Sequence, residues 1–391
     1  MLIISYDAIG DIEFENLMGY PAFRSLAEKS AVFRDVSTVF ISNTYPVHTS
    51  VVTGVLPCEH GVTSNTECFP SADPVWNGSE KMIKAKTVWQ HATEKGIKTA
   101  AVLWPVTGFS KTINYNIPEV IPRPGKSQIA ASLKAGSPFL QLKMFLRYGK
   151  IMKGYKQPQL DNFSAACMTD ILRGKLRRAK RGKKPYLALM HLTAYDTICH
   201  EYGPGSAETQ TAFEAMDANL AVLLDAADDD DVIVFSDHAQ IEIHTVTDPN
   251  SILVNEGLIF RTGNGYQSGE SGCFFELAGG SAFFHAGKLD VKRIEDLRSL
   301  AVKSEGFYRF LTAGEMRETG RNEAAFGICA KAGFCYEISG KMKKGNHGYP
   351  LDMEDYKVFY MVKGFGLKPG AVTYGGSLLD IAPLVIRRIN L

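Results

Sequence analysis

The sequence predicts an α/β fold in which a mainly parallel sheet lies between layers of helices. Three apolar runs, at residues 2–5, 185–192 and 232–235, each lead into a segment that carries an aspartate. This is the profile of buried parallel strands with polar groups at their carboxyl ends. Strand-like and helix-like segments also alternate over roughly the first hundred residues, as they do in βαβ units.

The expected elements begin with a strand at 2–5, a helix at 21–29 and a strand at 31–41. A helix is expected next at 46–53, because a proline near the first helical position loses no hydrogen bond. The later helices are expected at 87–94, 160–181, 206–225, 291–302 and 376–389, and the later strands at 98–103, 185–192, 232–235 and 358–362. Shorter elements are expected at 251–256, 272–277 and 281–285.

Two stretches interrupt this alternation. Residues 105–159 contain several prolines and a basic, amphipathic segment, and we interpret them as an insertion near the mouth of the active site. Residues 245–340 are rich in glycine, and we interpret them as a second insertion or a small subdomain. A length of 391 residues allows one large α/β domain with insertions or two domains. We predict a single domain that spans 1–391.

The composition excludes several classes of protein. The formal net charge is +1, so no overall field favours a nucleic-acid polymer as a partner. The seven cysteines form no C-x-x-C pair, which argues against a disulfide framework or a cysteine zinc site. No segment resembles a signal peptide, and none reaches the roughly 18 apolar residues of a membrane span. We therefore expect a cytoplasmic protein, whose oligomeric state the sequence does not indicate.

Thr44 lies between an expected strand and an expected helix, in the stretch Ser42-Asn43-Thr44-Tyr45-Pro46. A hydroxyl at this position would lie at a helix N-terminus, where backbone N–H groups and the helix dipole favour an anion such as phosphate. Thr44 is therefore a candidate nucleophile. The alternative is an ordinary helix cap, which is the commoner role of such a threonine, so the assignment depends on chemistry elsewhere in the chain.

Acidic residues and histidines gather after the predicted strands and in one glycine-flanked turn. Each of them could be a helix cap or a surface pair, but the ends of parallel strands meet in one crevice. Carboxylates and imidazoles together are suitable ligands for a pair of zinc ions. Two metals about 3.5–4 Å apart can hold the attacking and leaving oxygens of a phosphoryl transfer. The candidate residues are Asp7, Asp196, His200, Asp237, His238 and His347.

The order of these motifs resembles that of the type I phosphodiesterase/nucleotide pyrophosphatase family of the alkaline phosphatase superfamily. Six motifs in the family's order are specific, whereas one alone would not be. The sequence departs at Ala239, where the family usually has glycine after Ser-Asp-His. The matching positions are Asp7, Thr44, Asn65 after His60-Gly61, Asp196 with His200, Ser236-Asp237-His238, and His347-Gly348.

The resemblance implies an alkaline-phosphatase-like core with an inserted cap or small subdomain, and a site for two zinc ions, with manganese also possible. It implies that Thr44 attacks phosphorus to form a phosphothreonine, while Asn65 and the backbone N–H of Thr44 donate to the non-bridging oxygens. The substrate would be a small molecule with a phosphate ester or anhydride bond. The implied ligands of one ion are Asp196, His200 and His347; those of the other are Asp7, Asp237 and His238, together with the Thr44 oxygen.

Three alternative hypotheses share part of this evidence. A phosphonoacetate-type carbon–phosphorus hydrolase would have the same fold, metals and threonine, and would differ in a pocket that suits a small carboxylate. A phosphomonoesterase or phosphomutase of the superfamily typically uses serine as its nucleophile, so Thr44 argues against it. A metal-stabilised binding protein without turnover would need neither Thr44 nor Asn65. Outside the motifs, we expect surface lysines and structural histidines at Lys81, Lys84, Lys86, His191, His244 and His285.

Overall fold

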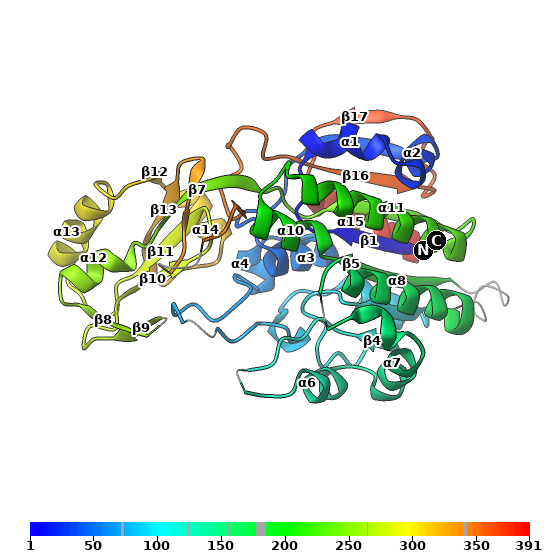
Figure 1. Cartoon of the computed structure of the whole chain (residues 1–391), viewed down its shortest axis with the longest axis horizontal. Coiled ribbons are helices and arrows are strands. Elements are labelled where there is room, and N and C mark those ends of the chain that lie inside the picture. Colours follow the sequence, from blue (N-terminus) through cyan, green and yellow to red (C-terminus); the bar gives the residue numbers. More distant parts are fainter. Residues whose placement is uncertain (72–73, 124, 155, 177–184, 264, 339–341) are drawn as a thin grey trace.

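A large sheet with helices on both faces forms one end of an elongated molecule, and a smaller group of strands and helices forms the other (Figure 1). The computed structural model describes residues 1–71, 74–123, 125–154, 156–176, 185–263, 265–338 and 342–391. The large sheet has eight strands in the order β17-β2-β16-β6-β1-β5-β3-β4. Within it, β16 pairs antiparallel with both neighbours and the other described pairs are parallel. The predicted α/β fold with a mainly parallel sheet is confirmed.

The middle of the sheet is formed by β1 (Leu2–Tyr6), β5 (Tyr186–Leu192) and β6 (Val232–Ser236), and every residue of these strands is buried. Strands covered on both faces are apolar throughout rather than alternating. Tyr6 is paired with Leu192 on one side and with Ser236 on the other, so the three strands end at one level. The outer strands are β2 (Ala31–Val36), β3 (Lys98–Val102), β4 (Tyr115–Ile117), β16 (Val358–Lys363) and β17 (Val372–Tyr374).

Helices form a layer on each face of this sheet. The helices on one face are α1 (Phe14–Met18), α2 (Pro21–Glu28), α8 (Gln159–Ile171), α10 (Ala194–Tyr202) and α11 (Ala207–Ala227). The helices on the other face are α3 (Thr44–Thr53), α4 (Pro57–His60), α5 (Val88–Glu94) and α15 (Ile381–Ile389). Short 3₁₀ turns occur at Asp11–Glu13, Glu80–Met82 and Leu378–Asp380. None of the helices in the described ranges is both long and apolar enough to cross a lipid bilayer.

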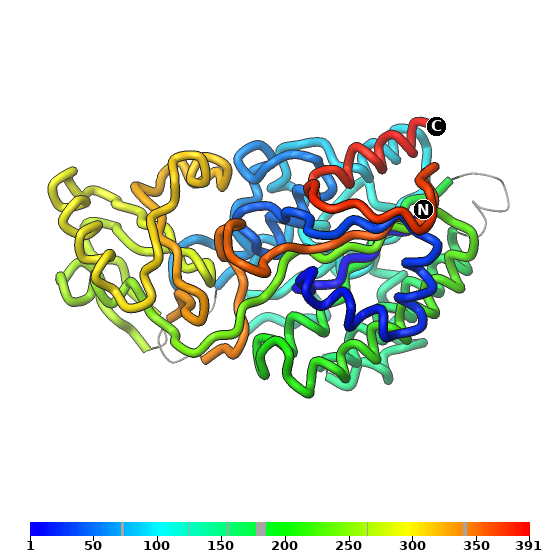
Figure 2. The backbone as a smooth tube through the Cα atoms, turned by 90° about the horizontal axis from the view of Figure 1, so that it is seen from above, coloured from blue at the N-terminus to red at the C-terminus, as the bar shows by residue number. Residues whose placement is uncertain are grey.

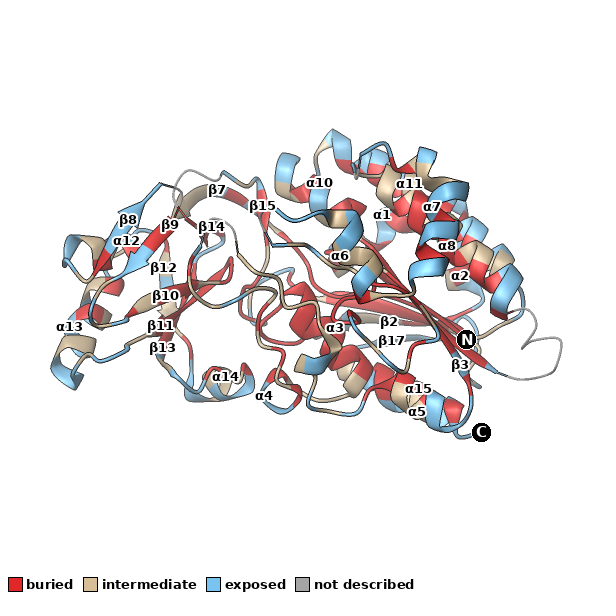
Figure 3. Cartoon of the chain, turned by 90° about the horizontal axis from the view of Figure 1, so that it is seen from below, coloured by how far each residue is buried: buried red, intermediate tan, exposed pale blue. Residues whose placement is uncertain are grey.

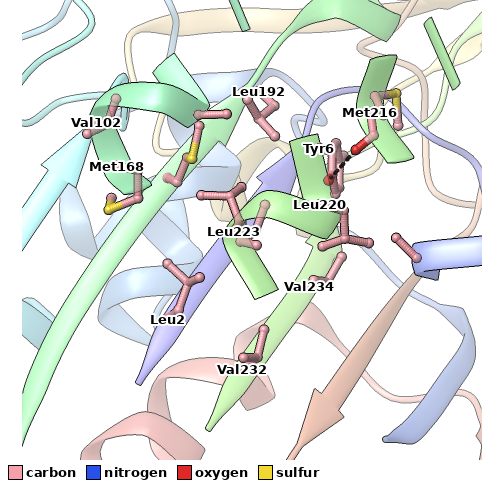
Figure 4. Packing of buried hydrophobic residues seen from close by; sticks show 14 of the residues in the cluster. Leu2, Tyr6, Val102, Met168, Leu192, Met216, Leu220, Leu223, Val232 and Val234 are labelled. Atoms are coloured by element: carbon pink, nitrogen blue, oxygen red, sulfur yellow. Dashed lines mark hydrogen bonds between the residues drawn. The ribbon is translucent and has the colours of Figure 1, made fainter. Parts of the chain in front are cut away.

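Alternate residues of β1 pack into two separate cores. Leu2 and Tyr6 lie in the core that contains residues of α8 and α11, and Tyr6 Oη donates to the carbonyl oxygen of Met216 at 3.2 Å (Figure 4). Ile3 lies in the opposite core, which contains residues of α3, α5 and α15. This alternation is the period of two that a strand imposes. Figure 3 shows the strands as a buried layer between helices whose outer faces are exposed.

Most expected elements occur, and their boundaries differ for identifiable reasons. β2 ends at Val36, which pairs with Val358, the first residue of β16; after it, Ser37 forms an isolated bridge with Ser377 instead of a continued ladder. The last helix begins at Ile381, since Ser377 caps a 3₁₀ turn before it. A π-helical turn at Leu172–Leu176 follows α8, and the end of the helix expected at 160–181 lies outside the described residues.

The stretch that we expected to be the first insertion contributes to the large sheet as well as to a cap. Its strand β4 pairs in parallel with β3 at the edge of the sheet. Two helices follow, α6 (Gln128–Ala135) and α7 (Pro138–Met152). α7 packs against α8 and β4, and α6 lies next to α7 (Figure 1). We therefore propose that the inserted part is the loop and helix segment after β4, within one domain that spans 1–391.

The smaller end is formed by the chain between β6 and β16, which leaves the large sheet and returns to it (Figure 2). A core of its own, which includes Phe275, Phe284 and Leu297, is what an inserted subdomain requires, and we propose that 245–340 is such a unit. The strands are β7 (Ile241–Thr247), β8 (Ile259–Thr262), β9 (Gly265–Ser268), β10 (Phe274–Leu277), β11 (Ser281–His285), β12 (Phe307–Phe310), β13 (Ala324–Ala330), β14 (Gly333–Tyr336) and β15 (Gly345–Asn346). The helices are α12 (Asn250–Asn255), α13 (Val291–Ala301) and α14 (Ala313–Glu318).

Candidate metal centre and active site

The carboxyl ends of three neighbouring strands carry the acidic residues of the site. Asp7 follows β1, Asp237 follows β6, and Asp196 lies in the first turn of α10, directly after β5. Because these strands are adjacent and in parallel register, their ends meet at one edge of the sheet. The fold therefore brings together residues that are far apart in the sequence, as open α/β sheets do at their carboxyl ends.

Asp7, Asp237 and His238 form a buried group, which we call the Asp7 cluster. Each offers one ligand atom, and these atoms lie within 4.8 Å of one another. The Nε2 atom of His238 is 3.3 Å from Asp7 Oδ1 and 3.4 Å from Asp237 Oδ2. Backbone N–H groups of Ala8 and His238 donate to Asp237 Oδ1 at 3.0 and 2.9 Å, so this carboxylate is held in one orientation.

The free carboxylate oxygens of the Asp7 cluster fit a divalent cation. Among the described atoms, Asp7 Oδ1 and Asp237 Oδ2 are buried and have no hydrogen-bond partner. Burial, and then repulsion from Asp237, raises the pKa of the Asp7 carboxyl well above its ordinary value. Buried carboxylates are stable when they are paired with charge or coordinate a metal. Two carboxylates and an imidazole are a donor set that zinc accepts.

Asp196, His200 and His347 form a second group of ligand atoms within 4.8 Å of one another, which we call the Asp196 cluster. Asp196 Oδ1 is 3.4 Å from His200 Nε2. His200 Nδ1 donates to the carbonyl oxygen of Gly345 at 2.7 Å, and His347 Nδ1 donates to Asn43 Oδ1 at 2.9 Å. Because Nδ1 of each ring carries the proton, Nε2 is the nitrogen that can bind a metal.

Burial keeps both histidines of this cluster neutral. It lowers the pKa of His200. It also lowers the pKa of His347 well below the ordinary value, and the neighbouring His238 and His200 add to the effect. The carboxylate of Asp196 is held by Gln240, whose Nε2 donates to Asp196 Oδ1 at 2.5 Å. A neutral imidazole is the form that coordinates metals, so the cluster is suited to a cation.

Thr44 lies where the two clusters meet. It is the first residue of α3, and its Oγ1 is 3.4 Å from His238 Nε2. The rings of His238 and His347 stack with centroids 4.1 Å apart, which joins the clusters. The N–H of Thr44 is among the first N–H groups of the helix, which have no carbonyl partner inside it. The hydroxyl and the N–H of Thr44 thus lie beside the junction of the Asp7 cluster and the Asp196 cluster.

Asn65 carries a side-chain donor beside the start of α3. Its Oδ1 accepts from the N–H of Tyr45 at 2.8 Å, so the amide NH₂ is its remaining polar group. A pocket of about 440 Å³ opens above the site. Asp237 and His238 are fully buried and are not among the residues that line it. The other six predicted site residues line it: Asp7, Thr44, Asn65, Asp196, His200 and His347.

Two buried histidines support the site from behind. His48 Nδ1 donates to the carbonyl oxygen of Thr44 at 2.8 Å, and its Nε2 is 2.8 Å from Ser5 Oγ. His191 Nε2 lies 3.2 Å from Asp7 Oδ2. Burial lowers the pKa of each ring to about 3. We expected His191 to be a structural residue, and in the structure its ring lies against the carboxylate of Asp7.

Several residues of the site carry no signal in the sequence. Asn43 and Gln240 form hydrogen bonds with the candidate ligands His347 and Asp196, but neither stands at a spacing that indicates this contact. Glu119 lines the pocket from the loop after β4, and burial followed by repulsion from Asp196 raises its pKa to about 8. Phe69 and Trp76 give the pocket an aromatic wall. Their contribution depends on how distant loops meet, which local patterns do not reveal.

Comparison with known proteins now assigns the family. Residues 1–303 match the sequence model of the family described as type I phosphodiesterase / nucleotide pyrophosphatase. The chain belongs to this family. The assignment made from the order of the motifs is confirmed. The matched part includes seven of the eight predicted site residues and ends before His347, which the structure brings next to His238.

Curated members of the family match part of the chain. Ectonucleotide pyrophosphatase/phosphodiesterase family member 1 of Homo sapiens is 22% identical over 216 residues, which are 52% of this chain and 19% of that protein. Venom phosphodiesterase 2 of Crotalus adamanteus is 23% identical over 223 residues, which are 52% of this chain and 22% of that protein. In both cases the matched part is a minor share of the relative's own length.

Solved structures of the family share the whole fold. Human ectonucleotide pyrophosphatase/phosphodiesterase 5 has a TM-score of 0.70 at 16% identity, covering 100% of this chain and 95% of that chain. An inactive threonine-to-alanine variant of the murine protein, in complex with AMP, has a TM-score of 0.68 at 16% identity with the same coverage. At this identity the similarity shows that the fold is common to them.

Proposed function

We propose that this family member is a metal-dependent hydrolase of phosphodiester or phosphoanhydride bonds that forms a covalent bond between Thr44 and phosphorus. The observation that carries the proposal is that the Thr44 hydroxyl lies 3.4 Å from His238, at the junction of the Asp7 and Asp196 clusters. A metal-binding protein without turnover would need neither this hydroxyl nor the donor that Asn65 offers beside it. Membership of the family supports the same class of reaction.

We assign one zinc ion to each cluster, with manganese as the other candidate. Asp7, Asp237 and His238 would hold one ion together with the Thr44 oxygen, and the Asp196 cluster would hold the other. Both are mixed oxygen and nitrogen sets, which zinc accepts. Bound zinc supplies Lewis-acid charge, which lowers the pKa of a nearby hydroxyl or water and stabilises a leaving oxygen.

The chain's own residues would act in two steps. In the first, Thr44 Oγ1 loses its proton to water and bonds to phosphorus, while the bond from phosphorus to the leaving oxygen breaks. In the second, water attacks phosphorus, the bond to Thr44 breaks and Thr44 regains a proton. In both steps the amide NH₂ of Asn65 and the N–H of Thr44 would donate to the non-bridging oxygens as negative charge develops.

The pocket lining favours a diester or anhydride over a small dianion. Among the described residues that line it, the cation is Lys343, whose ammonium lies 2.9 Å from Glu337. The carboxylate of phosphonoacetate, or the second charge of a phosphomonoester, would therefore have to compete with Glu337 for Lys343. The lysines that we considered for such a role, Lys81, Lys84 and Lys86, do not line the pocket.

The aromatic wall supports a nucleotide as one part of the substrate. Phe69 and Trp76 are half-buried residues of the pocket lining, and a flat base can stack on such rings. The complex of a structurally similar murine relative with AMP agrees with this assignment. We therefore propose nucleotide-containing diesters or anhydrides as the substrate class.

The test is the hydrolysis of bis-p-nitrophenyl phosphate, p-nitrophenyl phosphate and phosphonoacetate by the zinc-loaded protein. We expect a strong preference for the diester. In Thr44→Ala we expect kcat to fall by several orders of magnitude while the zinc content stays unchanged, because the nucleophile is lost and the carboxylate and imidazole ligands remain. Thr53→Ala is the matched control, since Thr53 ends the same helix and its hydroxyl donates to the Thr49 carbonyl oxygen.

Two outcomes would overturn the proposal. Full diesterase activity in Thr44→Ala would exclude the covalent step. Turnover of phosphonoacetate without hydrolysis of the diester would assign the site to carbon–phosphorus cleavage.

A further inference from the structure

The segment from residue 120 to residue 160 differs from the rest of the chain in charge. The whole chain has 43 basic and 42 acidic residues, but this segment contains no aspartate or glutamate. Its described residues form α6, α7, the loops around them and the first two residues of α8, and we call it the cationic cap. Its basic residues, all exposed, are Arg123, Lys126, Lys134, Lys143, Arg147, Lys150, Lys153 and Lys156.

Helix α7 carries apolar side chains on two faces, of which one is packed. Leu140 and Met144 are buried in the core shared with α8. Phe139 and Leu146 are 89% and 77% exposed, and Leu142 and Phe145 are also exposed. Spacings of three and four residues place these four exposed side chains on one face of the helix. A contiguous exposed apolar face of this kind marks an interaction site.

An apolar groove of about 480 Å³ lies between α6 and α7, next to this face. Ile129, Leu142 and Phe145 line the groove and are themselves exposed, so it opens to solvent. Glu119 and Thr193 also line it, and both belong to the pocket of the candidate active site as well. The exposed apolar surface of the cap is therefore continuous with a hollow that reaches the edge of that site.

Nearby acids offset only part of the positive charge. Asp170 of α8 accepts from Lys143 at 2.8 Å and also from Arg147. Glu67 lies 4.0 Å from Arg123. Within the described part of the chain these two carboxylates pair with three of the eight cations, so the cap keeps a net positive charge beside its apolar face.

We propose that the cationic cap docks the protein on a lipid surface that carries anionic headgroups. The exposed cations would face headgroup phosphates and carboxylates, while Phe139 and Leu146 would enter the boundary of the acyl chains, as the side chains of interfacial helices do. A nucleic acid or an acidic protein would satisfy the cations but leave the apolar face and the groove in water. A second copy of the chain would cover that face, but it would bring two sets of cations together.

The test is co-sedimentation with vesicles of phosphatidylcholine alone or mixed with phosphatidylserine, at low and at high salt. We expect binding to the mixed vesicles that weakens as salt rises, and much weaker binding to phosphatidylcholine alone, because the cations act through screened electrostatics. The double variant Phe139→Ser/Leu146→Ser should lose binding by about tenfold or more, since its apolar anchors are removed. Lys134→Glu/Lys150→Glu should lose the preference for phosphatidylserine.

Val291→Ser is the matched control. Val291 is 77% exposed, as Leu146 is, but it begins α13 in the subdomain, away from the cap (Figure 1). This variant should bind vesicles like the wild type. Hydrolysis of bis-p-nitrophenyl phosphate, a soluble substrate, should be unchanged in all the cap variants, so that loss of docking is separated from failure of the proposed reaction.

Three results would overturn the proposal. The first is the absence of wild-type binding to the mixed vesicles, and the second is undiminished binding by Phe139→Ser/Leu146→Ser. The third is light scattering that shows a wild-type dimer which this variant converts to a monomer, because a second copy would then be the occupant of the apolar face.

Discussion

His238 and His347 stack with their ring centroids 4.1 Å apart and their planes 27° from parallel. His238 belongs to the Asp7 cluster and follows β6, whereas His347 belongs to the Asp196 cluster and follows β15. The contact thus joins the large sheet to the smaller end of the molecule beside Thr44. Two ligand groups held side by side are what two-metal phosphoryl transfer requires.

Asp237→Ala should remove one of two bound metals. The substitution deletes a carboxylate whose Oδ1 is held by the N–H groups of Ala8 and His238 and whose Oδ2 is left for a ligand. We expect elemental analysis to find one zinc per chain in the variant and two in the wild type. Asp225→Ala is the control, because Asp225 is an exposed residue of α11 that pairs with Arg173. Two zinc ions in Asp237→Ala would contradict the assignment of this cluster.

Asn43→Ala should weaken the metal affinity of the Asp196 cluster by about 10–100-fold, as the loss of such supporting contacts does. Asn43 Oδ1 accepts from His347 Nδ1 at 2.9 Å and so directs Nε2 toward the other ligands. Competition with a coloured chelator measures the affinity directly. Asn43→Asp keeps an acceptor oxygen and should retain most of the affinity. An equal loss in both variants would show that Asn43 acts through packing rather than through this hydrogen bond.

Arg321→Met should destabilise the subdomain by roughly 3–5 kcal/mol, the usual result of leaving a buried charge without its partner. Arg321 Nη2 is 2.6 Å from Glu276 Oε1, and both side chains are 2% exposed. Urea unfolding at neutral pH measures the change in the free energy of unfolding. The double variant Glu276→Gln/Arg321→Met should lose less stability than Arg321→Met, because no ionised carboxylate is then buried. If Arg321→Met alone proved neutral, the ion pair would have no role in stability.

The same ion pair predicts a pH dependence. Burial by itself would raise the pKa of Glu276, but the charge of Arg321 and hydrogen bonds from His285 and Arg321 lower it to about 2, against an ordinary value of 4.5. A carboxyl group whose pKa is lower in the folded state than in the unfolded state stabilises the fold at any pH above its unfolded-state pKa. This contribution is lost as the pH falls through the folded-state pKa. The stability difference between wild type and Glu276→Gln should therefore be constant above about pH 5 and shrink toward pH 2. A difference that stayed constant down to pH 2 would contradict this.

Trp76→Ala should raise the KM of a nucleotide substrate by about tenfold, since stacking of a base on an aromatic side chain contributes at this level. The suitable pair of substrates is the p-nitrophenyl ester of thymidine 5′-monophosphate and methyl p-nitrophenyl phosphate, which share a leaving group. The KM of the methyl ester should not change, because it has no base to stack. Equal effects on both substrates would remove the aromatic wall as a determinant of specificity.

The candidate metal ligands could be proposed from the sequence because they follow local patterns. Asp7 and Asp237 directly follow apolar runs that form central strands, and His200 stands one helical turn after Asp196. The boundaries of the helices and strands were harder to predict from the sequence. β2 stops at Val36, which pairs with Val358, and this pairing joins residues more than three hundred positions apart.

The sequence by itself determined the fold class, the family and the residues that could bind metal. The reason is that buried strands appear as apolar runs of neighbouring residues, and the motifs can be read in order along the chain. Only the tertiary structure decided which groups support them: Asn43 behind His347, Gln240 beside Asp196, and Phe69 and Trp76 along the pocket. It also decided that α7 keeps one apolar face exposed, since periodicity shows that a helix has an apolar stripe but not whether another element covers it. The physical reason is that contacts between distant segments arise only when the whole chain is packed.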